Sequence, residues 1–201
     1  MNPLARSVTG PQFPLPVLVG YRATGKTTVA GGLAGLLGCE HLDADEALEA
    51  ESGCTIAQLI ADRGEPAFRD AETKLLSRLL DCREAILATG GGVVLRLENR
   101  RLLRQAGRPV IWLTAPAAEI RRRLAADPTT ASRRPALAGR DVLDEVEQAL
   151  GDREPRYREV ADVCFDTAAM SRDELVATIA AWLAARFPAP GASPPVRRDG
   201  P

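Results

Sequence analysis

Short apolar segments alternate with longer segments of helical periodicity along most of the chain. Five of the apolar segments have the length of a buried strand, at residues 15–19, 39–43, 85–89, 109–114 and 162–166. Strands that alternate with helices in this way form parallel sheets with helices on both faces. The pattern therefore predicts an α/β fold whose ligands bind at the carboxyl ends of the strands.

Three of the segments between these strands carry clear helix signals. One helix follows Lys26, and Gly38 suits its C-cap. Pro66 suits the first turn of a second helix, and Ser171 with Glu174 forms the capping box of a third. The apolar faces expected are Val29, Leu33, Leu36 and Leu37 in the first helix, Phe68, Leu75, Leu76 and Leu79 in the second, and Leu175, Ile179, Trp182 and Leu183 in the third.

The two ends of the chain lack this patterning. Residues 1–13 have no periodicity, and residues 188–201 are rich in Pro and Gly and contain few core-forming side chains. Such segments bury too little apolar surface to offset the entropy of ordering, so we expect flexible tails around one domain at 14–187. A length of 201 residues suits a single well-cored domain.

Composition and charge argue against several kinds of partner. The net charge is −1, and 26% of residues are charged, so bulk charge gives no support for binding to nucleic acid or a membrane. No apolar run reaches the length of a membrane span, and Pro and Gly interrupt the N-terminus too early for a signal peptide. The scattered cysteines and the single histidine indicate reduced thiols in a cytoplasmic protein rather than a zinc site. These cysteines are Cys39, Cys54, Cys82 and Cys164.

Residues 20–27, GYRATGKT, fit the G-x-x-x-x-G-K-[ST] pattern of a phosphate-binding loop. The motif follows a predicted strand and opens a helix, and this context disfavours a chance Gly-rich turn. Backbone N–H groups and the helix N-terminus attract a nucleotide phosphate, Lys26 adds a positive charge, and the Thr27 hydroxyl is placed to ligate Mg²⁺. Ala23 stands where such loops often have glycine, so a positive φ there would add strain.

Three further groups should lie near this loop if the strands are parallel. Asp43 and Asp45 end the second strand, where a carboxylate can meet Mg²⁺ or a hydroxyl; capping of the next helix is an equal alternative for Asp45. TGGG at 89–92 lets a ligand approach the backbone, unless it is only a flexible turn. Arg69 and Arg153 suit a carboxylate or a phosphate, although a single arginine is usually solvated. Together these groups suit a small polyhydroxylated acid better than a nucleobase.

Residues 127–141, DPTTASRRPALAGRD, are polar and basic and lie between two helical segments. This composition predicts a mobile lid that closes over ATP and excludes water, with an ordinary surface loop as the alternative. Arg133 or Arg134 would then contact the transferring phosphoryl group.

In order and spacing, these motifs resemble the shikimate kinase family over roughly residues 15–187. The resemblance rests on GYRATGKT, LDAD, GEPAFRDAE, TGGG, RRPAL and REPRY. It implies a P-loop NTPase of the nucleoside-monophosphate-kinase type, with three α/β/α layers, a five-stranded parallel sheet, an acceptor-binding region at about 43–72 and a lid at about 127–141. The implied reaction transfers the ATP γ-phosphoryl group to the 3-hydroxyl of shikimate, in chorismate and aromatic amino acid biosynthesis, by a cytoplasmic monomer with Mg²⁺.

The resemblance also implies a role for each site residue. Lys26, Asp43 and Arg134 are implied as catalytic, with Thr27 and Asp43 on Mg²⁺. Whether Asp43 acts as a base or only orients the hydroxyl and supports the metal stays open, as does the choice between Arg133 and Arg134. The implied ATP contacts are Ala23, Thr24, Gly25, Lys26, Thr27, Thr28, Arg123 and Arg134. The implied shikimate contacts are Asp45, Arg69, Gly90, Gly91, Gly92 and Arg153.

Two alternative functions remain. A gluconate-type sugar-acid kinase has the same fold and an acidic substrate, but TGGG and the pair Arg69 and Arg153 favour shikimate. A regulatory module that binds nucleotide without catalysis is disfavoured because the implied catalytic residues are all intact. Ala169 and Met170 stand where some relatives present a basic side chain to adenine, so the sequence specifies the base less firmly than the phosphates.

Overall fold

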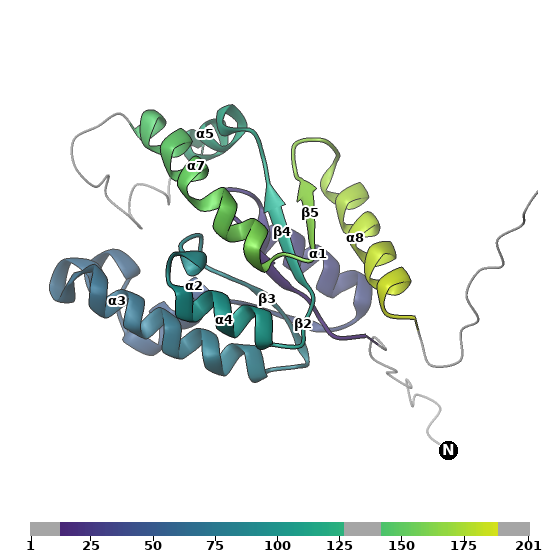
Figure 1. Cartoon of the computed structure of the whole chain (residues 1–201), viewed down its shortest axis with the longest axis horizontal. Helices are drawn as coiled ribbons and strands as arrows, with labels where there is room; N and C mark the ends of the chain where they lie inside the picture. Colours follow the sequence, from purple (N-terminus) through teal and green to yellow (C-terminus); the bar gives the residue numbers. More distant parts are fainter. Residues whose placement is uncertain (1–12, 127–141, 189–201) are drawn as a thin grey trace, which may run out of the picture.

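The computed structural model describes residues 13–126 and 142–188. Five parallel strands form one sheet in the order β2-β3-β1-β4-β5 (Figure 1). The strands are β1 (Val17–Val19), β2 (Glu40–Asp43), β3 (Ala85–Ala88), β4 (Val110–Thr114) and β5 (Val163–Asp166). Each strand falls within a segment predicted as a strand, and the five-stranded parallel sheet is confirmed.

Helices cover both faces of this sheet (Figure 1). One face carries α1 (Lys26–Leu37) and α8 (Arg172–Arg186); the other carries α3 (Ile56–Asp81), α4 (Leu97–Gln105) and α7 (Val142–Val160). The remaining described helices are α2 (Ala44–Ser52), α5 (Ala117–Ala126) and the short 3₁₀ turn η1 (Val93–Leu95). None of the helices in the described ranges is both long and apolar enough to cross a membrane.

Alternate side chains of the central strand β1 explain the three layers. Leu18 packs with α1 and α8, whereas Val17 and Val19 pack with α3, α4 and α7. All three side chains are fully buried. Because β1 is covered on both sides, its sequence is a continuous apolar run rather than an alternation of apolar and polar residues.

Helix α1 differs in one respect from its sequence pattern. It ends at Gly38, which adopts φ 66° as a left-handed C-cap, but Leu36, predicted on the buried face, is 58% exposed. That prediction was wrong because Ala30 and Ala34 complete the buried face of α1. Leu36 lies outside this face. A Cβ on Gly32 would lie 2.9 Å from Val176 Cγ2, so glycine allows the close approach of α1 and α8.

Helix α3 consists of two helical parts joined at a kink. Gly64 has non-helical angles of φ 81° and ψ 161°, and Pro66 begins the part that follows, as predicted. The first part starts at a capping box formed by Thr55 and Gln58, which the sequence analysis did not identify. The part after the kink carries Arg69 in its first turns.

A buried arginine joins the segments at the opposite edge of the sheet from the predicted site. Arg108 donates to the carbonyl oxygens of Leu15, Pro16, Cys82 and Ala85, at distances of 2.5 to 3.3 Å. Burial lowers the pKa of its guanidinium to about 10, with a smaller effect from the charge of Arg83. These hydrogen bonds compensate the removal of a charged group from water.

Candidate active site

The phosphate loop joins β1 to α1 at the carboxyl edge of the sheet. Lys26 is only 9% exposed, and its Nζ donates to the Tyr21 carbonyl oxygen at 2.9 Å. The Thr24 hydroxyl donates to the same oxygen at 2.7 Å. Gly25, at φ 84°, is the N-cap of α1, and because it has no side chain, it leaves the N–H groups of the first turn without a side-chain cap. The backbone N–H groups of the first turn are therefore placed to bind an anion.

Ala23 has the backbone strain that the sequence analysis anticipated. Its φ of 59° is the one positive value adopted by a non-glycine residue in the described ranges. A left-handed conformation costs an L-residue about 1–2 kcal/mol. The Ala23 carbonyl accepts from Arg123 Nη1 at 3.2 Å, and the same nitrogen donates to the Thr167 hydroxyl at 2.9 Å. Arg123 therefore links α5 to the loop and to the segment after β5.

Thr27 and Asp43, which come from α1 and β2, are in direct contact. The Thr27 hydroxyl donates to Asp43 Oδ2 at 2.5 Å. The other oxygen, Oδ1, accepts from the backbone N–H groups of Asp45 and Glu46 at 2.9 and 3.3 Å. Asp43 is thus the N-cap of α2, so the capping role considered for Asp45 belongs to Asp43.

This pair fits the ligand preference of Mg²⁺. The ion takes hard oxygen ligands and is usually held by one or two protein groups together with waters and substrate phosphates. Thr27 and Asp43 offer a hydroxyl and a carboxylate beside the phosphate loop. The described part of the chain holds no cluster of three or more His, Cys, Asp or Glu side chains that would bind a metal without substrate. The donor set therefore fits a metal shared with a nucleotide.

The glycine turn, residues 90–92, follows β3 and lies against predicted acceptor residues. A Cβ on Gly90 would lie 2.6 Å from Asp45 Oδ1. A Cβ on Gly92 would lie 2.4 Å from Arg69 Nη1. Side chains at these positions would displace either functional group, so the turn needs glycine for close approach rather than for unusual backbone angles.

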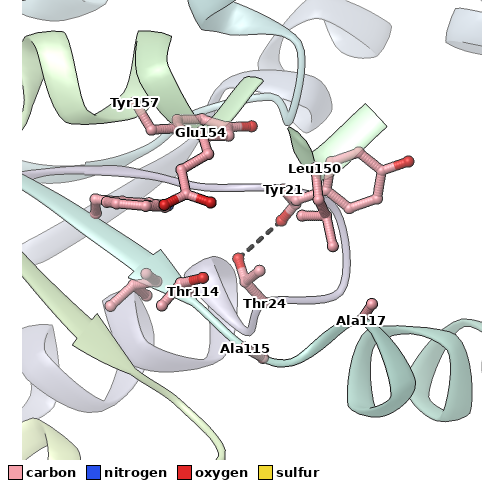
Figure 2. Close-up of a pocket in the computed structure, with 10 residues that line it drawn as sticks. Tyr21, Thr24, Thr114, Ala115, Ala117, Leu150, Glu154 and Tyr157 are labelled. Carbon is pink, nitrogen blue, oxygen red and sulfur yellow. Dashed lines mark hydrogen bonds between the residues drawn. The ribbon is translucent and has the colours of Figure 1, made fainter. Parts of the chain in front are cut away.

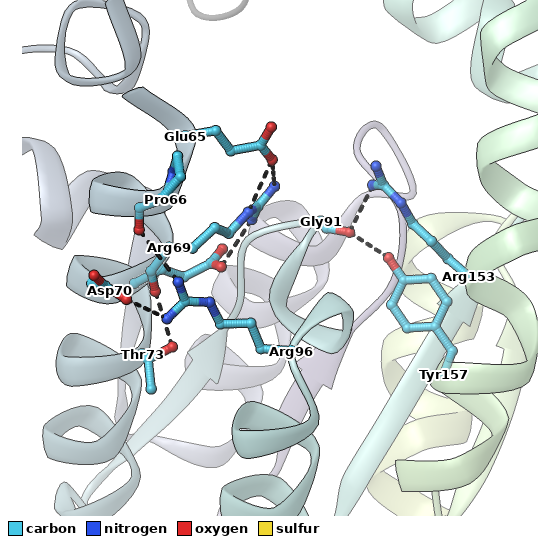
Figure 3. Close-up of polar contacts among 10 residues, drawn as sticks. Glu65, Pro66, Arg69, Asp70, Thr73, Gly91, Arg96, Arg153 and Tyr157 are labelled. Atoms are coloured by element: carbon cyan, nitrogen blue, oxygen red, sulfur yellow. Dashed lines mark hydrogen bonds and ion pairs between the residues drawn. The ribbon is translucent and has the colours of Figure 1, made fainter. Parts of the chain in front are cut away.

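Gly91 connects this turn to the phosphate loop and to α7. A Cβ on Gly91 would lie 2.9 Å from the backbone nitrogen of Arg22. The Gly91 carbonyl accepts from Arg153 Nη1 at 3.2 Å and from the Tyr157 hydroxyl at 2.6 Å (Figure 3). Burial raises the pKa of Tyr157 above its ordinary value, so its hydroxyl remains a donor. The phosphate loop and Arg153 therefore meet at one residue.

Arg69 is held in place by two glutamates of its own helix (Figure 3). Its guanidinium lies 2.9 Å from Glu72 Oε2 and 3.0 Å from Glu65 Oε1. Arg69 and Glu72 are 8% and 7% exposed. Burial lowers the pKa of Arg69, but the charges and hydrogen bonds of Glu72 and Glu65 outweigh it and the net shift is upward. Arg69 stays charged with its planar fork fixed.

Several of these supporting residues were not identified from the sequence. Glu72 lies three residues after Arg69 and Tyr157 four after Arg153, which are helical spacings that place each pair on one face. Arg96 was also missed. It donates to Asp70 Oδ1 at 2.6 Å and joins the segment after the glycine turn to α3 (Figure 3). The helical spacings were a usable signal for Glu72 and Tyr157, whereas no sequence signal links Arg96 to α3.

A cavity of about 210 Å³ borders the phosphate loop on its α7 side (Figure 2). Tyr21 and Thr24 of the loop, Thr114 at the end of β4 and Glu154 of α7 line it. It leaves open space beside Thr24, one of the ATP contacts implied by the family resemblance. The predicted lid at 127–141, with Arg133 and Arg134, lies outside the described residues, as do 1–12 and 189–201 of the predicted tails.

Comparison with known proteins decides the family. Residues 22–184 match the family model for shikimate kinase. The chain is 44% identical to the shikimate kinase of Nitratidesulfovibrio vulgaris over 144 residues. This alignment covers 72% of this chain and 81% of the relative. It is 38% identical over 162 residues to that of Rhodopirellula baltica, covering 81% and 86%. The chain belongs to the shikimate kinase family.

Solved structures agree with this membership. A shikimate kinase from Acinetobacter baumannii, in complex with shikimate, superposes with a TM-score of 0.80 at 34% identity, covering 87% of this chain and 94% of that one. A gluconokinase from Sinorhizobium meliloti reaches 0.54 at 16% identity, a likeness of fold alone. The predicted family, three-layer fold and class of ATP-dependent kinase are confirmed.

Proposed function

We propose that this protein transfers the γ-phosphoryl group of ATP to the 3-hydroxyl of shikimate and releases shikimate 3-phosphate and ADP. One contact supports this above all others: Gly91 lies against the phosphate loop at Arg22 and accepts a hydrogen bond from Arg153. A nucleotide phosphate and an acid anion bound to these groups would lie close together. Direct transfer requires this proximity, because most of its acceleration comes from positioning and charge stabilisation.

On the phosphate side, Lys26 stabilises the charge of the transferring group, and Arg134 of the predicted lid adds a second positive charge. Asp43 orients the acceptor hydroxyl or accepts its proton. Thr27 and Asp43 would hold Mg²⁺, which neutralises phosphate charge when bound. The loop backbone from Ala23 to Thr28 binds the phosphates, and Arg123, next to the segment after β5, contacts the adenine.

On the acceptor side, Arg69 and Arg153 bind the carboxylate of shikimate. Asp45 accepts hydrogen bonds from its hydroxyls, and the backbone of residues 90–92 forms the floor. Glu65 and Glu72 position the Arg69 fork but also offset its charge. This division explains why an acid with several hydroxyls suits the site better than an uncharged sugar.

A coupled assay of ADP release tests the proposal. The protein is given Mg-ATP with shikimate, with gluconate, or with no acceptor. We expect release that depends on shikimate, little release with gluconate, and only background without an acceptor. Release that depends on gluconate would favour the sugar-acid kinase alternative. Tight ATP binding without transfer to either acid would favour a regulatory nucleotide-binding module.

A further inference from the structure

Arg22 of the phosphate loop has a hydrogen-bond donor without an acceptor among the described residues. The residue is half-buried, and its Nε atom is enclosed without a hydrogen-bond partner in the described ranges. Its guanidinium carbon lies 5.7 Å from the centre of the Tyr21 ring. A ring face attracts the cation but leaves the N–H groups, which point outward in the guanidinium plane, without acceptors.

Arg108 provides the contrast within the same chain. It is also buried, but it donates to backbone carbonyls at the far edge of the sheet. Charged groups removed from water normally recover hydrogen bonds in this way. Arg22 Nε has no such bond in the described part of the chain, so the side chain lacks the fixed acceptors that hold Arg108.

The acceptor side carries more negative than positive charge around Arg69. Glu65 and Glu72 both contact Arg69, so two negative charges already face its single positive charge. Asp45 adds a further carboxylate at the glycine turn. An anionic acceptor therefore needs positive charge from elsewhere. Arg153 supplies one such charge, because it contacts the Gly91 carbonyl, the Tyr21 ring and Tyr157 and forms no ion pair among the described residues.

Arg22 and Arg153 share two neighbours, Gly91 and the Tyr21 ring. The backbone nitrogen of Arg22 lies against Gly91, whose carbonyl accepts from Arg153. The Tyr21 ring contacts both guanidinium groups, at 5.7 Å for Arg22 and 5.1 Å for Arg153. A loop arginine and an α7 arginine therefore both contact the Tyr21 ring, next to the glycine that connects the loop to the acceptor side.

We propose that Arg22 is a further acceptor-binding residue, which binds the carboxylate of the acid substrate together with Arg153. The proposal rests on the proposed function and extends it from two arginines to three. The three arginines then have different roles. Arg69, whose charge is already offset by two glutamates, orients the acid, whereas Arg22 and Arg153 supply most of the electrostatic attraction for its carboxylate.

Steady-state kinetics of Arg22→Met, Arg22→Lys and Arg101→Met test this assignment. Arg101 is an exposed α4 arginine, so its variant loses the same charge away from the site. We expect Arg22→Met to raise the KM for shikimate about tenfold, the effect of losing a charge-assisted hydrogen bond. The KM for ATP and the melting temperature should not change. Arg22→Lys should recover part of the loss, and Arg101→Met should match the wild type.

The methyl ester of shikimate, which lacks the negative charge, locates the interaction. If Arg22 binds the carboxylate, the ratio of KM between Arg22→Met and wild type falls towards one with the ester. A ratio that stays high with the ester, an unchanged KM for shikimate, or a rise in the KM for ATP instead would each overturn the assignment. If Arg22→Met does not fold, shikimate and its ester are compared in Arg22→Lys instead, where the rise in KM for shikimate is smaller but should likewise disappear with the ester. A wild-type protein without turnover of shikimate would instead refute the proposed function itself.

Discussion

The groups that bind the phosphates come mainly from one short stretch of chain, whereas the acceptor side is assembled from four separate segments. Residues 20–27 form the centre of the phosphate side, chiefly through backbone N–H groups and one lysine, and Asp43, Arg123 and Arg134 are proposed to complete it. The acceptor side takes Asp45 from α2, Arg69 from α3, the turn at 90–92 and Arg153 from α7. Backbone donors need only the right local fold, but charged side chains also need partners that fix them. The acceptor side can therefore be damaged without affecting the nucleotide.

The largest expected effect lies on the phosphate side. Lys26→Met should lower kcat about 10³-fold, because it removes a charge aimed at the transferring group. Lys74→Met is the matched control, since Lys26 and Lys74 are the only lysines of the chain and Lys74 is exposed on α3. Coupled kinetics and thermal melts separate turnover from folding. Near-normal turnover in Lys26→Met would show that the loop backbone stabilises the transferring group without the lysine charge.

The next effect concerns Asp43, which both caps α2 and contacts Thr27. Asp43→Asn should lower kcat about 10²-fold, because it removes the charge near the acceptor hydroxyl. The melting temperature should stay the same, since Asn caps helices as well as Asp does. Asp43→Ala should also lower the stability by about 1 kcal/mol. Unchanged turnover in the Asn variant would remove Asp43 from the mechanism.

A smaller effect is expected where the glycine turn meets α3. Gly92→Ala places a Cβ 2.4 Å from Arg69 Nη1, so the guanidinium must move. The KM for shikimate should rise about tenfold from the displaced charge-assisted bond. The KM for ATP should change little. The stability should fall, because the guanidinium is buried between Glu65 and Glu72 and must leave that position.

The control for this variant is Gly35→Ala, whose Cβ would meet no atom within 4 Å. Alanine in this helix interior should stabilise the protein by up to about 1 kcal/mol without kinetic effect. A parallel rise in both KM values for Gly92→Ala would mean that the turn couples the two sides and that they are not separable.

The smallest effect is expected from relieving strain in the phosphate loop. Ala23→Gly removes the left-handed strain at φ 59° and should stabilise the protein by about 1 kcal/mol. Differential scanning calorimetry would detect this as an increase of a few degrees in melting temperature. Turnover should stay near the wild-type value, because the loop backbone keeps its path. A lower melting temperature would mean that Ala23 makes packing contacts worth more than the strain.

The strands, the phosphate loop and the C-cap at Gly38 were predictable because each depends on residues close together in the chain. Leu36 was placed wrongly because alanines can complete a buried stripe as well as leucines do. The partners of Arg69 were within reach, since Glu65 and Glu72 lie one helical turn away. The contact between Arg96 and Asp70 was not, because 26 residues separate them.

The sequence by itself determined the layer order, the phosphate loop and the chemical character of the substrate, since periodicity and local turn geometry specify the first two and residue type the third. Only the tertiary structure decided which groups are already neutralised. It pairs Arg69 with two glutamates, makes Asp43 both a cap and a partner of Thr27, and leaves Arg22 Nε without a partner among the described residues. The physical reason is that the charge a ligand meets depends on which side chains converge after the strands align, and a linear sequence does not specify that convergence.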